Sequence, residues 1–153
     1  MKCVQGNRHA SGFSLIQIMV ALAVVGILAG IAFPSFREAG RKAKRAEGRS
    51  ALHQLMLQEE RFYSQRNKYL AFSSASAGED EKLFKWYSGN NPAGSAYEIK
   101  AEPCPDDTIY NCVRLVAMPG TSRVDPNFED AECGELFLSS TGEKGANKPE
   151  CWR

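Results

Sequence analysis

The sequence lacks the short motifs by which many enzymes and metal sites are recognised. It has no G-x-S-x-G turn for a nucleophilic serine and no glycine-rich loop that would cradle a phosphate. No C-x-x-C spacing occurs among the five cysteines, and histidine is scarce, which argues against zinc. A Ser-His-Asp arrangement would have to use His53, which lies in a charged stretch. The sequence therefore indicates no catalytic residue, no cofactor and no metal ligand.

Charge is absent from residues 13–36, although 24% of the residues are charged. As a helix rising about 1.5 Å per residue, residues 13–33 would be about 31 Å long, enough to cross a bilayer's hydrocarbon core. A secretory signal peptide has a shorter apolar centre and a small-residue cleavage site after it, whereas Pro34 and Arg37 follow here. A buried helix of a soluble protein would need protein on every side of the run. The run therefore predicts a membrane-spanning helix beside a single domain.

The residues at the start of this run carry a more specific signal. The preceding segment, MKCVQGNRHASG, contains two basic residues and no acid, and it ends at Gly12. With the following GFSLIQIMVALAVVGILAGIAFPSF, it resembles the class III signal of type IV pilins and related pseudopilins. The resemblance implies that residues 1–12 are a leader, that prepilin peptidase cuts between Gly12 and Phe13, and that Phe13 is then N-methylated. It also assigns an assembly role to the helix-loosening residues Gly26, Gly30 and Pro34.

Gln17 departs from the family pattern, which normally has a glutamate there that is assigned the role of neutralising a neighbouring subunit's first amine. An ionised group at membrane depth costs about 2.5–3.5 kcal/mol on insertion scales. Glutamine is cheaper to bury but offers no full charge for that pairing. Two interpretations stay open: a low-abundance or end-positioned pilin whose incorporation does not depend on the ion pair, or a tolerated isostere in an ordinary minor subunit.

Beyond Pro34 the helix is expected to resume, because apolar residues recur at three- and four-residue steps. The pattern predicts an amphipathic helix over residues 35–70 that continues into a globular domain. Its apolar positions change from alanine to larger side chains, so the first half is expected to pack beside other helices and the second to cover a sheet. Residues 58–70, QEERFYSQRNKYL, resemble the helix end of minor pilins.

Basic residues crowd the start of this second helical half. One interpretation is phosphate contact with DNA, since some family members bind DNA during transformation. The other is a helix surface in a filament, laced with near-neighbour ion pairs. The second is favoured because no aromatic or Asn/Gln base-reading set accompanies the charges, and because the chain without its leader would carry 17 basic and 18 acidic residues, a net charge of −1. The candidate DNA contacts are Arg41, Lys42, Lys44 and Arg45.

Four cysteines lie in the last third of the chain, and Cys3 would leave with the leader. An even set in an exported domain predicts disulfides, and three pairings are open from the residues alone. The order along the chain and the resemblance to the family's C-terminal loop favour Cys104 with Cys112 and Cys133 with Cys151. Loops of these sizes would contribute about 2.5 and 3 kcal/mol. The cysteines and the signal together overrule the positive-inside rule, which alone would keep the basic stretch in the cytoplasm.

The segment after the helix contains turn-rich clusters followed by β-forming stretches. Residues 72–95 are expected to form a connecting loop with LFKWY as a short ordered piece. Three or four antiparallel strands should follow, at residues 97–101, 113–118 and 135–140. The closing CGELFLSSTGEKGANKPECW resembles the end of a subgroup of minor pilins that finish with a Cys-Trp pair.

An acidic loop precedes the third expected strand. Some secretion pseudopilins hold calcium in such a loop, but the ligand spacing here matches no recognised cage, so a solvated loop is favoured. The acids are Asp125, Glu129, Asp130 and Glu132.

These features predict an α+β fold: a long N-terminal helix, with a membrane half (13–34) and an amphipathic half (35–70), packed on a small antiparallel sheet (71–153) whose C-terminal region disulfides close. They favour a non-enzymatic minor or assembly-priming subunit of a type IV pilus, held in the inner membrane with its C-terminal domain in the periplasm and then moved into the extracellular pilus. The implied partners are prepilin peptidase/N-methyltransferase, other major and minor pilins, the inner-membrane assembly platform and membrane lipid. One alternative is a DNA-uptake or adhesive module. Another is a type II secretion pseudopilin, and the Cys-Trp ending favours a pilus subunit over that one.

Overall fold

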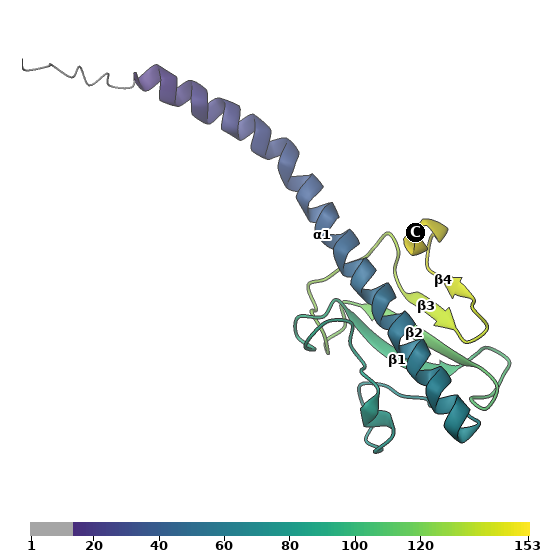
Figure 1. The fold of residues 1–153 in the computed structure, drawn as a ribbon. Helices are drawn as coiled ribbons and strands as arrows, with labels where there is room; N and C mark the ends of the chain where they lie inside the picture. Colours follow the sequence, from purple (N-terminus) through teal and green to yellow (C-terminus); the bar gives the residue numbers. More distant parts are fainter. Residues whose placement is uncertain (1–13) are drawn as a thin grey trace, which may run out of the picture. The chain divides into compact units, whose positions relative to one another are not determined.

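A computed structural model of the chain describes residues 14–153, apart from the side chains of residues 31–34. It divides into two units, Met1–Ala39 and Gly40–Arg153. A long helix, α1, runs from Leu15 to Arg66 and is followed by a four-stranded antiparallel sheet (Figure 1). The predicted α+β class is confirmed.

The helix ends where the backbone turns left-handed. Asn67 has φ 54°, and its N–H donates to the carbonyl of Tyr63 at 2.8 Å. Asparagine tolerates this conformation better than most residues, so it serves as a helix stop. The helix therefore ends at Arg66, before the expected residue 70.

The sheet has the order β1-β2-β3-β4, so each strand pairs with the next along the chain. Residue Ala117 of β2 lies between Ile99 of β1 and Leu136 of β3. The three strands predicted from the sequence are present, and a two-residue fourth strand follows the turn at Gly142. The strands are β1 (Tyr97–Pro103), β2 (Val113–Pro119), β3 (Leu136–Ser139) and β4 (Lys144–Gly145).

Within the unit Gly40–Arg153, the last turns of α1 cover one face of this sheet (Figure 1). Leu52 and Leu55 supply the largest helix side chains in the core, and both are buried. Burying an aliphatic side chain of this size stabilises a fold by about 1.5–3 kcal/mol. The alternate strand residues that meet them are fully buried: Tyr97, Ile99, Val113, Leu115 and Leu136.

Gly48 allows α1 to approach the sheet closely. A Cβ at this position would lie 2.8 Å from the Cδ2 atom of Tyr97, closer than side chains tolerate. A glycine inside a helix costs about 1 kcal/mol relative to alanine, and here that cost is offset by seating the Tyr97 ring against the helix backbone.

The connection between α1 and β1 is packed rather than loose. Phe72 pairs with Ala101 and Tyr87 with Glu98, so this segment covers the outer edge of β1. A short 3-10 helix, η1, spans Glu81–Leu83, and Phe84 after it stacks on Phe72 with ring centroids 5.1 Å apart. A second 3-10 helix, η2, spans Pro149–Trp152.

Candidate functional site

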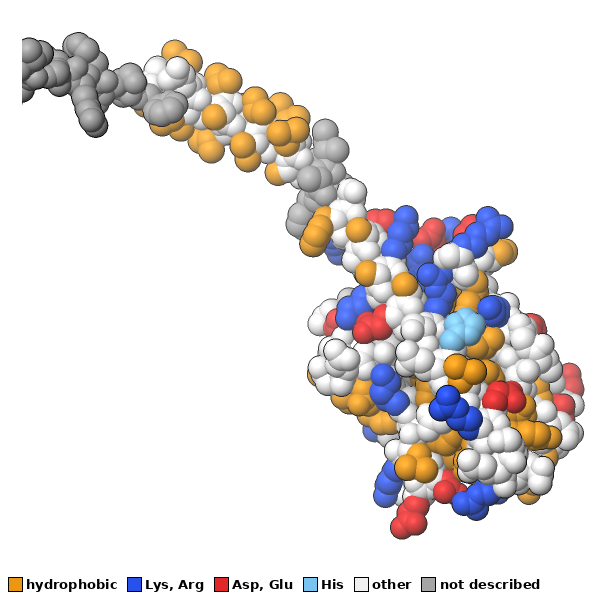
Figure 2. Space-filling model, in the orientation of Figure 1, with side chains coloured by type: hydrophobic (Ala, Val, Ile, Leu, Met, Phe, Trp, Pro, Cys, Tyr) orange, Lys and Arg blue, Asp and Glu red, His pale blue; other side chains and the backbone are white. Residues whose placement is uncertain are grey.

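The first half of α1 presents apolar side chains that no other described part of the chain covers. Every side chain described from residue 15 to residue 30 is exposed, including Leu15 at 73% and Ile27 at 67%. Figure 2 shows these side chains covering this part of the helix, while the globular unit mixes apolar and charged groups on the face in view. The stretch is long and apolar enough to cross a membrane. Its apolar surface needs lipid or other proteins to cover it.

Gln17 has a local role at the start of the helix. Its Oε1 accepts a hydrogen bond from the backbone N–H of Ser14 at 3.0 Å. Ser14 directly precedes the helix, and a glutamine three residues later that reaches back in this way is one half of a capping box. The amide therefore satisfies one of the N–H groups that a helix start leaves unpaired.

The other predicted assembly residues lie within α1 or outside the described residues. A Cβ at Gly26 or Gly30 would meet nothing within 4 Å among the described residues, so no contact between them requires glycine there. Pro34 is helical in its backbone, and its side chain lies outside the described ones. Gly12 and Phe13, the predicted cleavage and methylation residues, also lie outside the described part.

The basic stretch of α1 fastens the helix to three different loops. Lys44 donates to the carbonyl of Gly94 at 3.1 Å and lies 3.4 Å from Glu47. Arg45 reaches the acidic loop, and Arg49 donates to the main-chain oxygen atoms of Cys151 and Arg153. Arg41 and Lys42 are exposed. The cluster therefore joins the helix to other parts of the domain through Lys44, Arg45 and Arg49, and it also forms an ion pair along the helix between Lys44 and Glu47.

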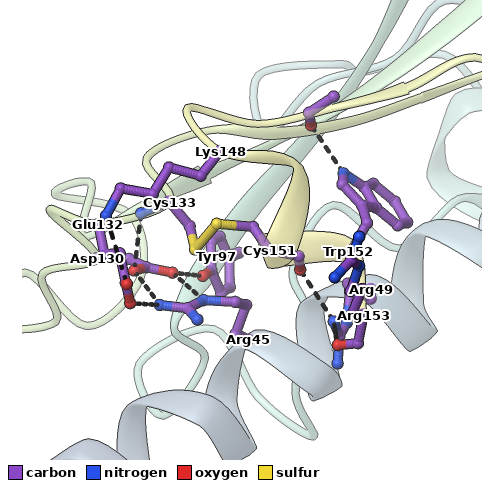
Figure 3. The surroundings of a disulfide bond; sticks show 11 residues. Arg45, Arg49, Tyr97, Asp130, Glu132, Cys133, Lys148, Cys151, Trp152 and Arg153 are labelled. Carbon is purple, nitrogen blue, oxygen red and sulfur yellow. Dashed lines mark hydrogen bonds and ion pairs between the residues drawn. A yellow bond between two sulfur atoms is a disulfide. The ribbon is translucent and has the colours of Figure 1, made fainter.

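Arg45 is the centre of a buried polar network (Figure 3). Its Nη2 and Nε donate to the two carboxylate oxygens of Asp130 at 2.7 and 2.9 Å, and Nη2 also lies 3.3 Å from Glu132. The hydroxyl of Tyr97 donates to the same Asp130 carboxylate at 2.6 Å. Arg45 is only 7% exposed, so the structure removes it from the candidate DNA contacts.

The charges in this network stabilise each other. Burial alone would raise the pKa of the Asp130 carboxyl, but hydrogen bonds from Arg45 and Tyr97 hold it below its usual value. The hydrogen bond to Asp130 raises the pKa of Arg45. Burial, and then the hydrogen bond to Asp130, raises the pKa of Tyr97. The pair is therefore ionised and the phenol neutral throughout the physiological range.

The acidic loop is organised by this network. Asp130 and Glu132 both face Arg45, while Asp125 accepts a hydrogen bond from the backbone N–H of Asn127. Glu129 is exposed. Among the described residues, no group of three His, Cys, Asp or Glu side chains is placed to hold a metal ion. Asp130 is thus a buried anchor for α1, whereas Glu129 and Glu132 are exposed.

Two disulfides close the C-terminal region. Cys104 is bonded to Cys112, and Cys133 to Cys151, the pairing that the resemblance favoured. The indole N–H of Trp152 donates to the carbonyl of Gly145 at 2.9 Å. The Cys-Trp ending therefore fixes η2 against both the acidic loop and β4.

A pocket of about 160 Å³ lies between α1 and this fixed C-terminal segment. Its lining is mostly basic. Figure 3 shows Arg45 and Arg49 on α1, with Arg153 after η2 beside Arg49. The lining residues are Lys42, Arg45, Arg49, Glu150 and Arg153.

Glu59 is a buried ionisable group that sequence reasoning missed. It is fully buried; its Oε2 accepts the backbone N–H of Leu70 at 3.0 Å, and no donor among the described residues reaches its Oε1. Burial raises its pKa to about 7, although the Leu70 N–H acts in the opposite direction. The only signal in the sequence is its place four residues after Leu55, on the buried face of the helix.

Two family models match the chain. Residues 34–137 match the family described as "Type IV minor pilin ComP, DNA uptake sequence receptor". Residues 7–33 match the prokaryotic N-terminal methylation motif. The two matches adjoin each other and meet within α1.

One relative and one solved structure are similar to parts of the chain. The type IV major pilin protein PilA of Myxococcus xanthus (strain DK1622) is 32% identical over 74 residues, which are 48% of this chain and 34% of the relative. The chain thus matches about a third of that relative's length. A type IV pilin from Shewanella oneidensis has a TM-score of 0.47 at 24% identity, over 74% of this chain and 98% of that one.

The first of the two family models covers well over half of the chain, from the end of the apolar run to β3. The second covers the signal identified from the sequence. With a disulfide-closed domain on a helix whose first half is apolar and exposed, the chain belongs to the type IV minor pilin family.

Proposed function

We propose that this chain is a minor subunit of a type IV pilus and enters the filament through the first half of α1. The observation that carries the proposal is the apolar surface of residues 15–30, which no described part of the chain covers. Proteins of the matched family are structural, and the proposal assigns this chain no catalytic role.

The proposed domains follow from this role. Residues 1–12 are a leader, residues 13–34 the membrane and assembly helix, residues 35–70 the amphipathic segment and residues 71–153 the loop and sheet. Prepilin peptidase cuts between Gly12 and Phe13, and the new terminus is methylated. The match to the N-terminal methylation motif over residues 7–33 supports this step.

Before assembly the helix is surrounded by lipid in the inner membrane, with the globular unit in the periplasm. Lipid tails and neighbouring pilin helices are both apolar surroundings, so transfer between them is nearly balanced. Small contacts with other major and minor pilins and with the assembly platform then decide whether the subunit leaves the membrane. The platform and the peptidase are partners inferred from the family.

Mass spectrometry of the protein from cells tests the processing step. We expect a chain that begins at Phe13 and carries one added methyl group. Gly12→Val should leave the leader attached and remove the protein from sheared pili, whereas the neighbouring Ser11→Ala should change neither. An intact Met1 terminus in the wild-type protein, or cleavage after Pro34, would contradict the proposal.

A second candidate function is binding of DNA. The matched family's description names a DNA uptake sequence receptor. Arg41 and Lys42 are exposed, and Lys42 lines a mostly basic pocket. Binding through phosphates would weaken steeply with salt, by about one power of the salt concentration for each phosphate contacted. Affinity of the full chain in detergent micelles for a labelled duplex, measured between 50 and 200 mM salt, tests this function. No binding at either salt concentration would exclude it.

A further inference from the structure

One carboxyl oxygen of Glu59, near the end of α1, is buried without a partner. The whole side chain is buried, and no donor among the described residues reaches its Oε1. The other oxygen, Oε2, accepts one hydrogen bond, from the backbone N–H of Leu70 at 3.0 Å. A buried carboxylate needs several donors or a cation to offset the loss of water, so this arrangement suits the protonated group.

The hydrogen bond from Leu70 holds the segment that follows the helix, residues 67–72. Within this segment Tyr69 stacks on Tyr63 of α1, with ring centroids 4.5 Å apart. At its end, Phe72 forms two backbone hydrogen bonds with a residue of β1, at 3.2 and 2.8 Å, and covers the edge of the sheet there. The segment therefore links α1 to the sheet, and one of its contacts with the helix is made to a titratable group.

Few charged groups act on the Glu59 carboxyl. Glu60, the next residue of α1, repels a negative charge there, which adds to the larger effect of burial. From the segment packed against the helix, the hydroxyl of Tyr69 donates to Glu60 at 3.0 Å, and burial raises the pKa of that phenol, so it stays neutral. Lys68 of the same segment is exposed. Among the described residues, only the Leu70 N–H favours the ionised form of Glu59.

We propose that Glu59 is a proton-controlled clasp for residues 67–72. With its proton the side chain stays in the core and holds the segment against α1. Without it the carboxylate moves into water, and the segment is released from the helix and from the edge of β1. Release leaves the backbone groups of Ala101 unpaired at that edge, where another extended chain can pair. The clasp lies in the globular unit, so it does not depend on how the chain enters a filament.

The direction of the pH effect follows from burial. Burial raises the pKa of the Glu59 carboxyl to about 7 while the segment is closed, whereas a solvated glutamate has its usual value of 4.5. The closed form therefore holds more protons between these values, and it is favoured most at the lower one. The ratio of open to closed segment should rise with pH between 4.5 and 7 and level off above 7.

Amide hydrogen exchange of the full chain in detergent micelles, followed by NMR between about pH 5 and 7.5, tests the clasp. After correction for the intrinsic exchange rates, protection of the Leu70 and Phe72 amides should fall by about 30- to 100-fold over this range. Glu59→Gln keeps the size of the side chain but cannot titrate, so their protection should change by less than about twofold. Glu60→Gln, on the exposed neighbour, is the matched control and should keep most of the pH dependence.

Two results would overturn the clasp. Protection of the Leu70 amide that stays constant over this pH range in the wild type would show that Glu59 does not control the segment. Exchange of residues 67–72 at the same corrected rate as the central strand β2 would show that they open only with the whole domain. Both results come from the wild type, so the test stands even if thermal unfolding shows that Glu59→Gln is not folded.

Discussion

The two halves of α1 differ in where their apolar side chains find partners. In the first half Leu22 and Leu28 are 66% and 62% exposed, whereas in the second Leu52 and Leu55 are 0% and 3% exposed. Helix formation is common to both, so it does not explain the difference. The sheet covers the apolar side chains of the second half, whereas those of the first half need lipid or other subunits to cover them.

The largest effect should come from breaking the network that holds the second half to the acidic loop. Asp130→Ala leaves the Arg45 guanidinium buried without its carboxylate, which should lower the free energy of unfolding by about 3–5 kcal/mol. Chemical denaturation of the full chain in micelles, followed by tryptophan fluorescence, measures it. Glu129→Ala, on the exposed neighbour, should cost less than about 0.5 kcal/mol. Equal losses in the two variants would show that the network does not anchor the helix.

A matched pair of leucines compares the two halves directly. Leu52→Ala opens a cavity in the core and should cost the domain about 2–5 kcal/mol. Leu22→Ala removes the same atoms from an exposed position, and should leave unfolding of the domain within about 0.5 kcal/mol of the wild type. The same denaturation experiment measures both. A large loss for Leu22→Ala would mean that the first half packs on the domain.

Buried Glu59 makes the second half sensitive to pH. Burial raises the pKa of the Glu59 carboxyl to about 7 in the folded state, from its usual value of 4.5. Folding therefore takes up a proton at pH values between 4.5 and 7. Stability from Glu59 is therefore complete below pH 4.5 and is lost as pH rises through 7, by an amount on the order of 2 kcal/mol.

Comparing the wild type with Glu59→Gln across this pH window isolates the effect. Burial lowers the pKa of His53 below 6.5, so His53 makes the free energy of unfolding rise with pH near the same values. This contribution is common to both proteins and cancels in the comparison. The wild type should lose stability relative to Glu59→Gln between pH 4.5 and 7. A constant difference would show that Glu59 does not titrate there.

The smallest effect concerns the first half. Gln17→Glu retains an acceptor for the Ser14 N–H and adds the charge that the family usually has, so incorporation into sheared pili should rise about twofold, equivalent to about 0.4 kcal/mol. Gln17→Leu loses the capping acceptor, so its incorporation into sheared pili should not rise. Unchanged incorporation of Gln17→Glu would favour a tolerated isostere and remove the idea of a missing ion pair.

Local patterns predicted the elements well and the site only in part. Periodicity located α1 and three strands, because burial on one face repeats at the spacing of the element itself. It did not locate the end of α1 at Arg66, which depends on the backbone conformation of Asn67. The basic stretch was interpreted from its own neighbours, yet its buried member pairs with a carboxylate 85 residues away.

Composition and spacing along the chain suffice to identify an uncharged apolar stretch, the basic residues on either side of it and an even number of cysteines beyond it. Which partner each cation of the basic stretch contacts depends on the fold. Arg45 and Arg49 follow the same local pattern as Lys42, but Arg45 pairs with Asp130 in the acidic loop and Arg49 donates to main-chain oxygen atoms of the C-terminal segment, whereas Lys42 is exposed. That distinction depends on contacts between residues far apart in the chain, which no local pattern records.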